Sequence, residues 1–540
     1  MLNKTLLGSA AVIMTMVGAQ AADLPSKKAA PATYVKICDA YGAGFFFIPG
    51  TETCVKLGGY VRYELQYTPG KDLIVPNATT AAAATATANA RVAGANIVTA
   101  KEVQDTFGTE YRGRITVDAR TPTGYGTART VIALRGTGVT GLNKAQYAYT
   151  TGTIAPTLGG TNAELVTEQA FIQWAGFTAG IAGSNYAMIP SMTYKANIWA
   201  GFPNGMRQLS YTAVLGGGFS ATLALEDKQM WGNDTAATSP ATGMAANTIV
   251  NRPDTAIAPV VNIRLDQSWG FAAVHGVMAK HTLSNSATPA ADTNTAQGTF
   301  QGNSALVPAL STNPVTKTGW GIGTTVSFKL DMIAKGDQVW LTANYMDGFW
   351  GALMGSGSIT SPSDGSSGGR TLGGVIRKDA NVVFKGVNPA NNVNTGYDTT
   401  TGWNVGGQFL HYWSPTWRSV FTAGYAEVNP PTQAQTASLA WGKGTVAEGR
   451  GSIIYSPTNN FDIGLELQYV RNTNKIQNAS TVAAGSTGAA WVAQGLPGLN
   501  NDNWTGKFRV ERSFCSTSAF PANGGLVLTS LATSEILINS

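Results

Sequence analysis

The chain has 540 residues, of which 12% are charged and 9% aromatic, with 64 glycines and a formal net charge of +6. Charge this dilute does not favour a nucleic-acid partner, which needs Lys and Arg gathered on one patch. No internal window reaches the 18 or so unbroken apolar residues of a membrane-spanning helix, so a bundle of membrane helices is excluded. No Pro-rich linker or composition shift divides the middle, and we expect one main domain.

Residues 1–22 have the pattern of a secretory signal. Lys4 gives a basic start, an apolar stretch runs over residues 6–17, and residues 19–22 are Ala-Gln-Ala-Ala. This predicts cleavage after Ala21 or Ala22 and a mature chain that begins near Asp23. The alternative is a membrane anchor, for which the apolar run is too short. We therefore expect export.

Residues 23–57 are expected to form a periplasmic N-terminal segment that contains Cys38 and Cys54. In an oxidising periplasm the two thiols can pair, and closing a loop of about 15 residues would contribute about 3 kcal/mol in the chain-entropy model. No further Cys or His lies nearby in the sequence, so a metal site is not expected here.

From residue 58 to residue 514 the sequence repeats runs in which apolar and polar residues alternate. Alternation gives a strand one apolar and one polar face, and a closed cylinder of such strands has lipid outside and water inside. The predicted fold is all-β, an antiparallel transmembrane β-barrel of about sixteen strands. The predicted strands cover residues 59–67, 107–119, 128–135, 169–175, 179–184, 208–215, 219–225, 257–265, 272–278, 320–328, 339–345, 403–409, 417–425, 453–455, 461–469 and 504–514.

The predicted connections alternate between short turns, such as 121–126 and 176–178, and long stretches. The long ones cover 68–106 and regions near 137–167, 227–253, 282–317, 347–400 and 472–502. Short periplasmic turns and long external loops are typical of outer-membrane barrels. Aromatic residues at strand ends, among them Tyr60, Tyr67, Trp320 and Trp403, predict two interfacial girdles.

Several segments resemble the mature N-terminus of the alphaproteobacterial porins: AADLP at 21–25, YVKIC at 34–38, YGAGF at 41–45, IPGT at 48–51 and CVKLGGYVR at 54–62. The ending GKFRVERSF at 506–514 is similar to theirs as well. The resemblance implies a sixteen-stranded barrel in the bacterial outer membrane, usually a homotrimer. It implies passive passage of small hydrophilic solutes, with outer-membrane lipid and the barrel-assembly machinery as partners and no cofactor.

Charged residues on the polar faces of the first three predicted strands are the candidate pore lining. The basic ones are Arg62, Arg112, Arg114, Arg120, Arg129 and Arg135, and the acidic ones are Glu64, Glu110 and Asp118. Clustered guanidinium groups in a narrow channel attract anions. The alternative is that the arginines pair with neighbouring carboxylates as structural contacts. Acidic residues on other polar faces, such as Asp266, Glu466 and Glu511, could also cancel the bias.

In porins of this type a loop after the fifth strand commonly folds into the barrel. Here that stretch is residues 186–204, which contain Lys195 and no carboxylate. The predicted constriction therefore carries a basic bias, and we expect a weak preference for anions.

Enzyme chemistry is not favoured. Residues 365–369 fit the G-x-S-x-G spacing of a hydrolase nucleophile, but no apolar strand precedes them and no helix follows. His275 and His281 would lie about 20 Å apart on one strand, too far to share a metal. His411 has no obvious partner in the sequence.

Two alternative functions remain possible besides a diffusion pore. One is a surface-exposed adhesin or binding β protein, and the other is a channel specific for a sugar or an anion such as phosphate.

The predicted final strand ends at Phe514, the terminal aromatic residue expected of such a barrel. Residues 515–540 follow, open with the unpaired Cys515, and lack the alternation of further strands. We interpret them as a tail outside the barrel. The alternative is a real extension that docks in the lumen or on the periplasmic rim.

Overall fold

The computed structural model describes residues 37–67, 73–77, 96–100, 107–141, 146–150, 153–157, 162–186, 189–190, 192–194, 205–231, 249–251, 257–285, 315–349, 351–354, 382–384, 387–388, 393–394, 397–429, 443–475 and 500–514. The predicted signal peptide, Lys195, the 365–369 motif and residues 515–540 lie outside these ranges. No helix in the described residues is long and apolar enough to cross a membrane.

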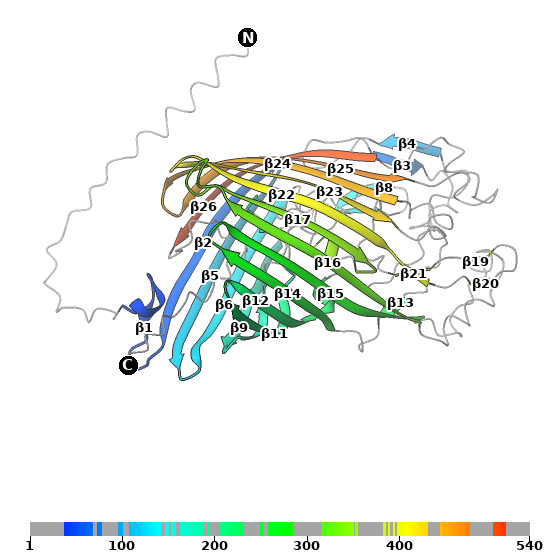
Figure 1. The fold of residues 1–540 in the computed structure, drawn as a ribbon. Coiled ribbons are helices and arrows are strands. Elements are labelled where there is room, and N and C mark those ends of the chain that lie inside the picture. Colours follow the sequence, from blue (N-terminus) through cyan, green and yellow to red (C-terminus); the bar gives the residue numbers. More distant parts are fainter. Residues whose placement is uncertain are drawn as a thin grey trace, which may run out of the picture.

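Sixteen antiparallel strands form a closed barrel, which confirms the predicted fold. They are β2 (Cys54–Tyr67), β5 (Phe107–Thr123), β6 (Gly126–Gly141), β9 (Asn162–Trp174), β10 (Phe177–Ala182), β11 (Met206–Gly216), β12 (Phe219–Asp227), β14 (Ile257–Gln267), β15 (Gly270–Asn285), β16 (Val315–Lys329), β17 (Gln338–Asp347), β22 (Thr401–Ser414), β23 (Trp417–Asn429), β24 (Lys443–Thr458), β25 (Phe461–Lys475) and β26 (Asn500–Phe514). Each pairs with the next along the chain, and β26 closes the ring on β2, beside which it lies in Figure 1.

Short elements flank the barrel. β1 (Phe46–Phe47) pairs with β2 and β13 (Ile249–Asn251) with β15. Within the described residues, four small two-stranded sheets combine β3 (Leu73–Asn77) with β4 (Asn96–Ala100), β7 (Gln146–Thr150) with β8 (Thr153–Thr157), β18 (Val382–Phe384) with β21 (Tyr397–Thr399), and β19 (Val387–Asn388) with β20 (Val393–Asn394). The helical turns are η1 (Asp39–Tyr41), η2 (Lys228–Trp231) and α3 (Gly351–Met354).

The sequence alternation decides which side chains face outward. On β2 the residues Val61, Tyr63 and Leu65 are exposed, whereas Arg62 and Glu64 are buried inside the barrel. The other strands repeat this arrangement, so the outer surface is apolar and aromatic. Tyr60 is a correction to the predicted girdles: it is 2% exposed and faces inward, where the Arg62 guanidinium lies 4.9 Å from its ring centroid.

Most turns that connect the predicted strand pairs have two residues between strand ends, as in β5–β6, β9–β10 and β11–β12. The predicted turn at 176–178 was placed too late in the chain. Phe177 and Thr178 already pair with Trp174 and Gln173, and the turn consists of Ala175 and Gly176, both with positive φ. Two positive φ angles are what a type I′ hairpin turn requires. Alternation alone does not locate such a turn, because Phe177 continues the apolar pattern.

The described part of the N-terminal segment, which begins at Ile37, lies at one end of the barrel, beside the turn of β5 and β6 (Figure 1). A disulfide joins Cys38 to Cys54 with a Cα separation of 6.0 Å, which confirms the predicted pairing. The bonded cysteines and Phe45 form a small separate core. The Arg120 guanidinium on β5 lies 4.8 Å from the Phe45 ring centroid, so this core is held against the barrel wall.

Candidate functional site: the charged inner wall

Charged side chains cover the inner face of neighbouring strands on one side of the barrel. The predicted residues Arg62, Glu64, Glu110, Arg112, Arg114, Asp118, Arg129 and Arg135 lie on β2, β5 and β6, and alternation directs all of them inward. Like charges face each other directly across strands, with Arg62 opposite Arg112 and Glu64 opposite Glu110. Such pairs are unfavourable. Arg62 and Glu64 instead bind the opposite charges that face them directly on β26, Glu511 and Arg509, and Arg112 binds Glu110 on its own strand.

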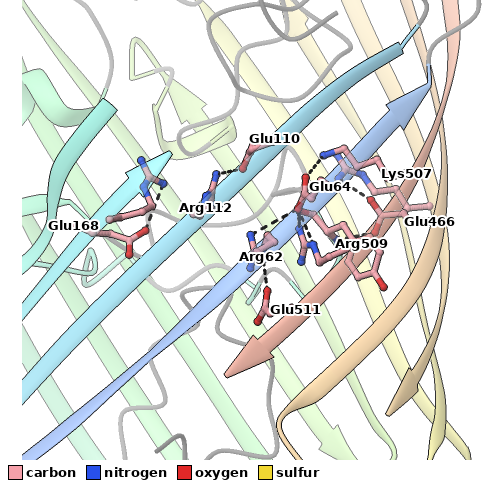
Figure 2. Close-up of polar contacts among 12 residues, drawn as sticks. Arg62, Glu64, Glu110, Arg112, Glu168, Glu466, Lys507, Arg509 and Glu511 are labelled. Atoms are coloured by element: carbon pink, nitrogen blue, oxygen red, sulfur yellow. Dashed lines mark hydrogen bonds and ion pairs between the residues drawn. The ribbon is translucent and has the colours of Figure 1, made fainter. Parts of the chain in front are cut away.

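A first group, which we call the buried cluster, is centred on Glu64 (Figure 2). Glu64 binds the Lys507 ammonium at 3.1 Å and Nε of Arg509 at 2.7 Å. Arg62 binds Glu511 at 2.6 Å, and Arg450 binds Glu448 and lies 3.8 Å from Glu466. The cluster contains Arg62, Arg450, Lys507 and Arg509 with Glu64, Glu448, Glu466 and Glu511, and every one of these side chains is 4% exposed or less. Four positive and four negative groups balance, as burial of charge requires.

A second group, which we call the open wall, is accessible to solvent. Arg112 binds Glu110 at 2.7 Å, Arg114 binds Glu168 at 2.6 Å, and Arg135 reaches Glu168 at 3.5 Å. Asp118 accepts bonds from Arg120 and Arg129. The open wall consists of Arg112, Arg114, Arg120, Arg129 and Arg135 with Glu110, Asp118 and Glu168, whose side chains are 10–30% exposed. Five basic groups meet three acidic ones, so this wall has an excess of two positive charges.

All six arginines that the sequence singled out have a carboxylate partner, as the alternative interpretation of paired arginines predicts. However, these arginines do not form one continuous cluster of guanidinium groups along the pore. Arg62 and Glu64 are sealed from solvent, while the arginines of β5 and β6 remain accessible. From the sequence, Glu466 and Glu511 are acidic residues on other polar faces that could cancel the basic bias. In the structure both belong to the buried cluster.

Glu168 is a site residue that the alternation pattern missed. Leu165 is 76% and Ile172 58% exposed, so the outward phase of β9 changes between them. The register with β6 shifts there, with Ala133 opposite Gln169 and Leu134 opposite Thr167. A bulge at this point lets Glu168 and Gln169 both contact Arg114. The only sequence signal is that alternation in β9 fails at Glu168.

The segment after β10 does fold into the barrel, as the sequence predicts. The Tyr186 hydroxyl donates to Asn344 on β17 at 3.2 Å, and the Met192 amide donates to Gln408 on β22 at 3.1 Å. Tyr194 reaches β25, where its amide donates to Glu466 at 2.7 Å. At the start of the segment, Glu226 accepts bonds from Ser184 and the Asn185 amide. This segment therefore crosses from one wall to the other.

Burial raises the pKa of the Tyr186 hydroxyl and of the Tyr194 hydroxyl well above the usual range. Both hydroxyl groups therefore stay protonated at alkaline pH values at which an exposed tyrosine would ionise.

Two stretches predicted as external loops return inside the barrel in their described parts. Trp231 of η2 packs edge-to-face on Tyr186 with ring centroids 5.4 Å apart, and Phe349 packs on Trp231 at 5.3 Å. Ala352 and Leu353 of α3 belong to the same buried apolar cluster. These groups lie on the side of the lumen away from the buried cluster and the open wall.

The histidines have structural partners. His411 Nδ1 lies 2.6 Å from the Asp337 carboxylate, which corrects the expectation that it lacks a partner. His275 Nε2 contacts Asn344 at 3.2 Å, and its ring packs on Tyr186. Among the residues that the structure describes, no three His, Cys, Asp or Glu side chains are grouped to hold a metal ion.

Residues 23–494 match a family described as the Porin subfamily. The chain belongs to this family. As a porin with a closed β-barrel, it is a protein of the bacterial outer membrane. Porin Omp2b of Brucella suis biovar 1 (strain 1330) is 31% identical to this porin over 232 residues, and Porin Omp2b of Brucella abortus (strain 2308) is 32% identical over the same length. Each match covers 42% of this chain and 54% of the relative, so the porin spans about half the length of these relatives.

Solved structures of similar arrangement include the outer membrane channel DcaP of Acinetobacter baumannii. It has 15% identity and a TM-score of 0.47, and the match covers 87% of this porin and 99% of that chain. The trimer form of OmpT from Vibrio cholerae has 9% identity and a TM-score of 0.40, with 86% and 100% covered.

Proposed function

We propose that this porin is a passive diffusion pore for small hydrophilic solutes and ions. The observation that carries the proposal is the open wall: charged side chains on the inner face of a closed barrel stay accessible to solvent. An apolar outer surface and a charged, accessible inner wall match lipid outside and water inside. A soluble adhesin would hide its apolar residues instead, and here many large apolar side chains of the strands are exposed on the outer surface.

Conductance in a planar bilayer tests the proposal. The detergent-purified protein should give stepwise, ohmic current increments. A protein that stays silent after verified refolding would contradict a pore and favour the adhesin. Currents that saturate with one added solute would instead indicate a specific channel for a sugar or an anion.

For ion preference we propose a weak lean toward anions at low salt. The charges of the buried cluster balance, whereas the open wall has an excess of two positive charges that act on ions in the lumen. Screening shortens the reach of this field to about 10 Å at 0.1 M salt, so the preference should fade as salt rises. Reversal potentials in a salt gradient measure it, and a clear cation preference would contradict the proposal.

We also propose a homotrimer, with outer-membrane lipid and the barrel-assembly machinery as further partners. The support is family membership and the resemblance of the N-terminal segments. The native mass in detergent tests the oligomeric state, for which a monomer of 56.2 kDa including the signal peptide is the alternative.

A further inference from the structure

Three contacts hold Tyr194 against the barrel wall. Its amide donates to Glu466 on β25, and its carbonyl oxygen accepts a bond from Arg509 on β26. The Arg509 guanidinium also lies 4.1 Å from the centroid of the Tyr194 ring. Because Glu466 and Arg509 belong to the buried cluster, the wall that binds Tyr194 is itself fixed by ion pairs.

A glycine makes room for the ring. A Cβ at Gly464 on β25 would overlap the Tyr194 hydroxyl, lie 3.0 Å from Cζ and lie 2.7 Å from the Ile453 carbonyl oxygen. Glycine inside a strand often marks such a close approach. The Tyr194 hydroxyl is buried and makes no hydrogen bond within the described residues. Besides its two backbone bonds, Tyr194 therefore contacts this wall through packing of its ring and not through a bond of its hydroxyl.

We propose that packing of Tyr194 against Gly464 fixes the inward segment, by which we mean the described residues from the end of β10 to Tyr194, and so sets the width of the pore. The inference rests on the proposed pore function and names the residues that position the inward segment inside the barrel. The ring and the segment that carries it lie over the buried cluster, which is neutral. Release of the ring therefore widens the lumen without adding net charge, so conductance rises and the reversal potential stays where it was.

Two variants of Tyr194 separate the ring from the hydroxyl. Tyr194→Phe keeps the ring on Arg509 and loses only an unbonded hydroxyl, so its single-channel conductance should equal that of the wild type. Tyr194→Ala loses the ring, and its conductance should be higher, with an unchanged reversal potential. A role in folding alone would lower the yield of folded barrel and leave the conductance of each channel unchanged.

Gly464→Ala tests the same contact from the wall. The added Cβ displaces the ring, so conductance should rise as in Tyr194→Ala, and the double variant should add nothing further. Gly506→Ala on the neighbouring strand is the matched control, because a Cβ there meets nothing within 4 Å. Since the new Cβ also presses on Ile453, folding of Gly464→Ala must be verified, and the Tyr194 pair decides the question if it does not fold.

The outcomes distinguish a failure of this inference from a failure of the proposed pore function. Wild-type protein without conductance would refute the pore itself. A conducting wild type with the same conductance in Tyr194→Ala would overturn only the role of Tyr194.

Discussion

Removal of Glu511 should destabilise the barrel strongly, because it leaves a buried guanidinium without its nearest partner. Arg62 and Glu511 lie 2.6 Å apart, and their side chains are 2% and 4% exposed. Breaking a buried ion pair from one side typically costs about 3–5 kcal/mol. Glu64 remains 3.8 Å from Arg62, so we expect Glu511→Ala to lower the free energy of unfolding by about 3 kcal/mol, the low end of that range.

Urea unfolding of the refolded barrel in detergent measures this cost, and an accessible pair supplies the control. Arg264 binds Asp266 at 2.7 Å with side chains 18% and 43% exposed, so Asp266→Ala should cost about 1 kcal/mol or less. In the double variant Arg62→Met with Glu511→Leu, most of the stability should return, because no unpaired charge remains. If Glu511→Ala costs no more than Asp266→Ala, the cluster is hydrated and the reasoning from burial is wrong.

Three further outcomes are expected. Arg114→Gln should move the reversal potential toward cation preference and Glu168→Gln toward anion preference, because each removes one accessible charge of the open wall; no shift in either would contradict the assignment. Cys38→Ser should lower the free energy of unfolding by about 3 kcal/mol through loss of the disulfide to Cys54, and the same loss under reducing conditions in the wild type checks the cause. Truncation after Phe514 should leave the yield of folded protein in the outer membrane equal or higher, whereas loss of assembly would show that residues 515–540 belong to the fold.

The sequence alone determined the barrel and, apart from the bulge in β9, the direction of the side chains of its strands. Strand alternation is a local property with a period of two, so every strand could be placed and Arg62 assigned to the inner face without knowledge of its neighbours. The Cys38–Cys54 disulfide was equally local, because few residues separate the two thiols. Even Tyr60 followed this rule, since its place in the alternation put it inside and only its aromatic character suggested the membrane interface.

Only the tertiary structure decided which charges are accessible and how they pair. Partners such as Arg62 and Glu511, or Arg114 and Glu168, are far apart in the chain and meet through strand register and through a bulge that breaks the alternation. Accessibility depends in addition on what packs over a strand, and the segment that carries Tyr194 is held on the buried cluster by residues of β25 and β26. A pattern with a period of two describes a strand and its two faces, so it contains no information about what lies over either face.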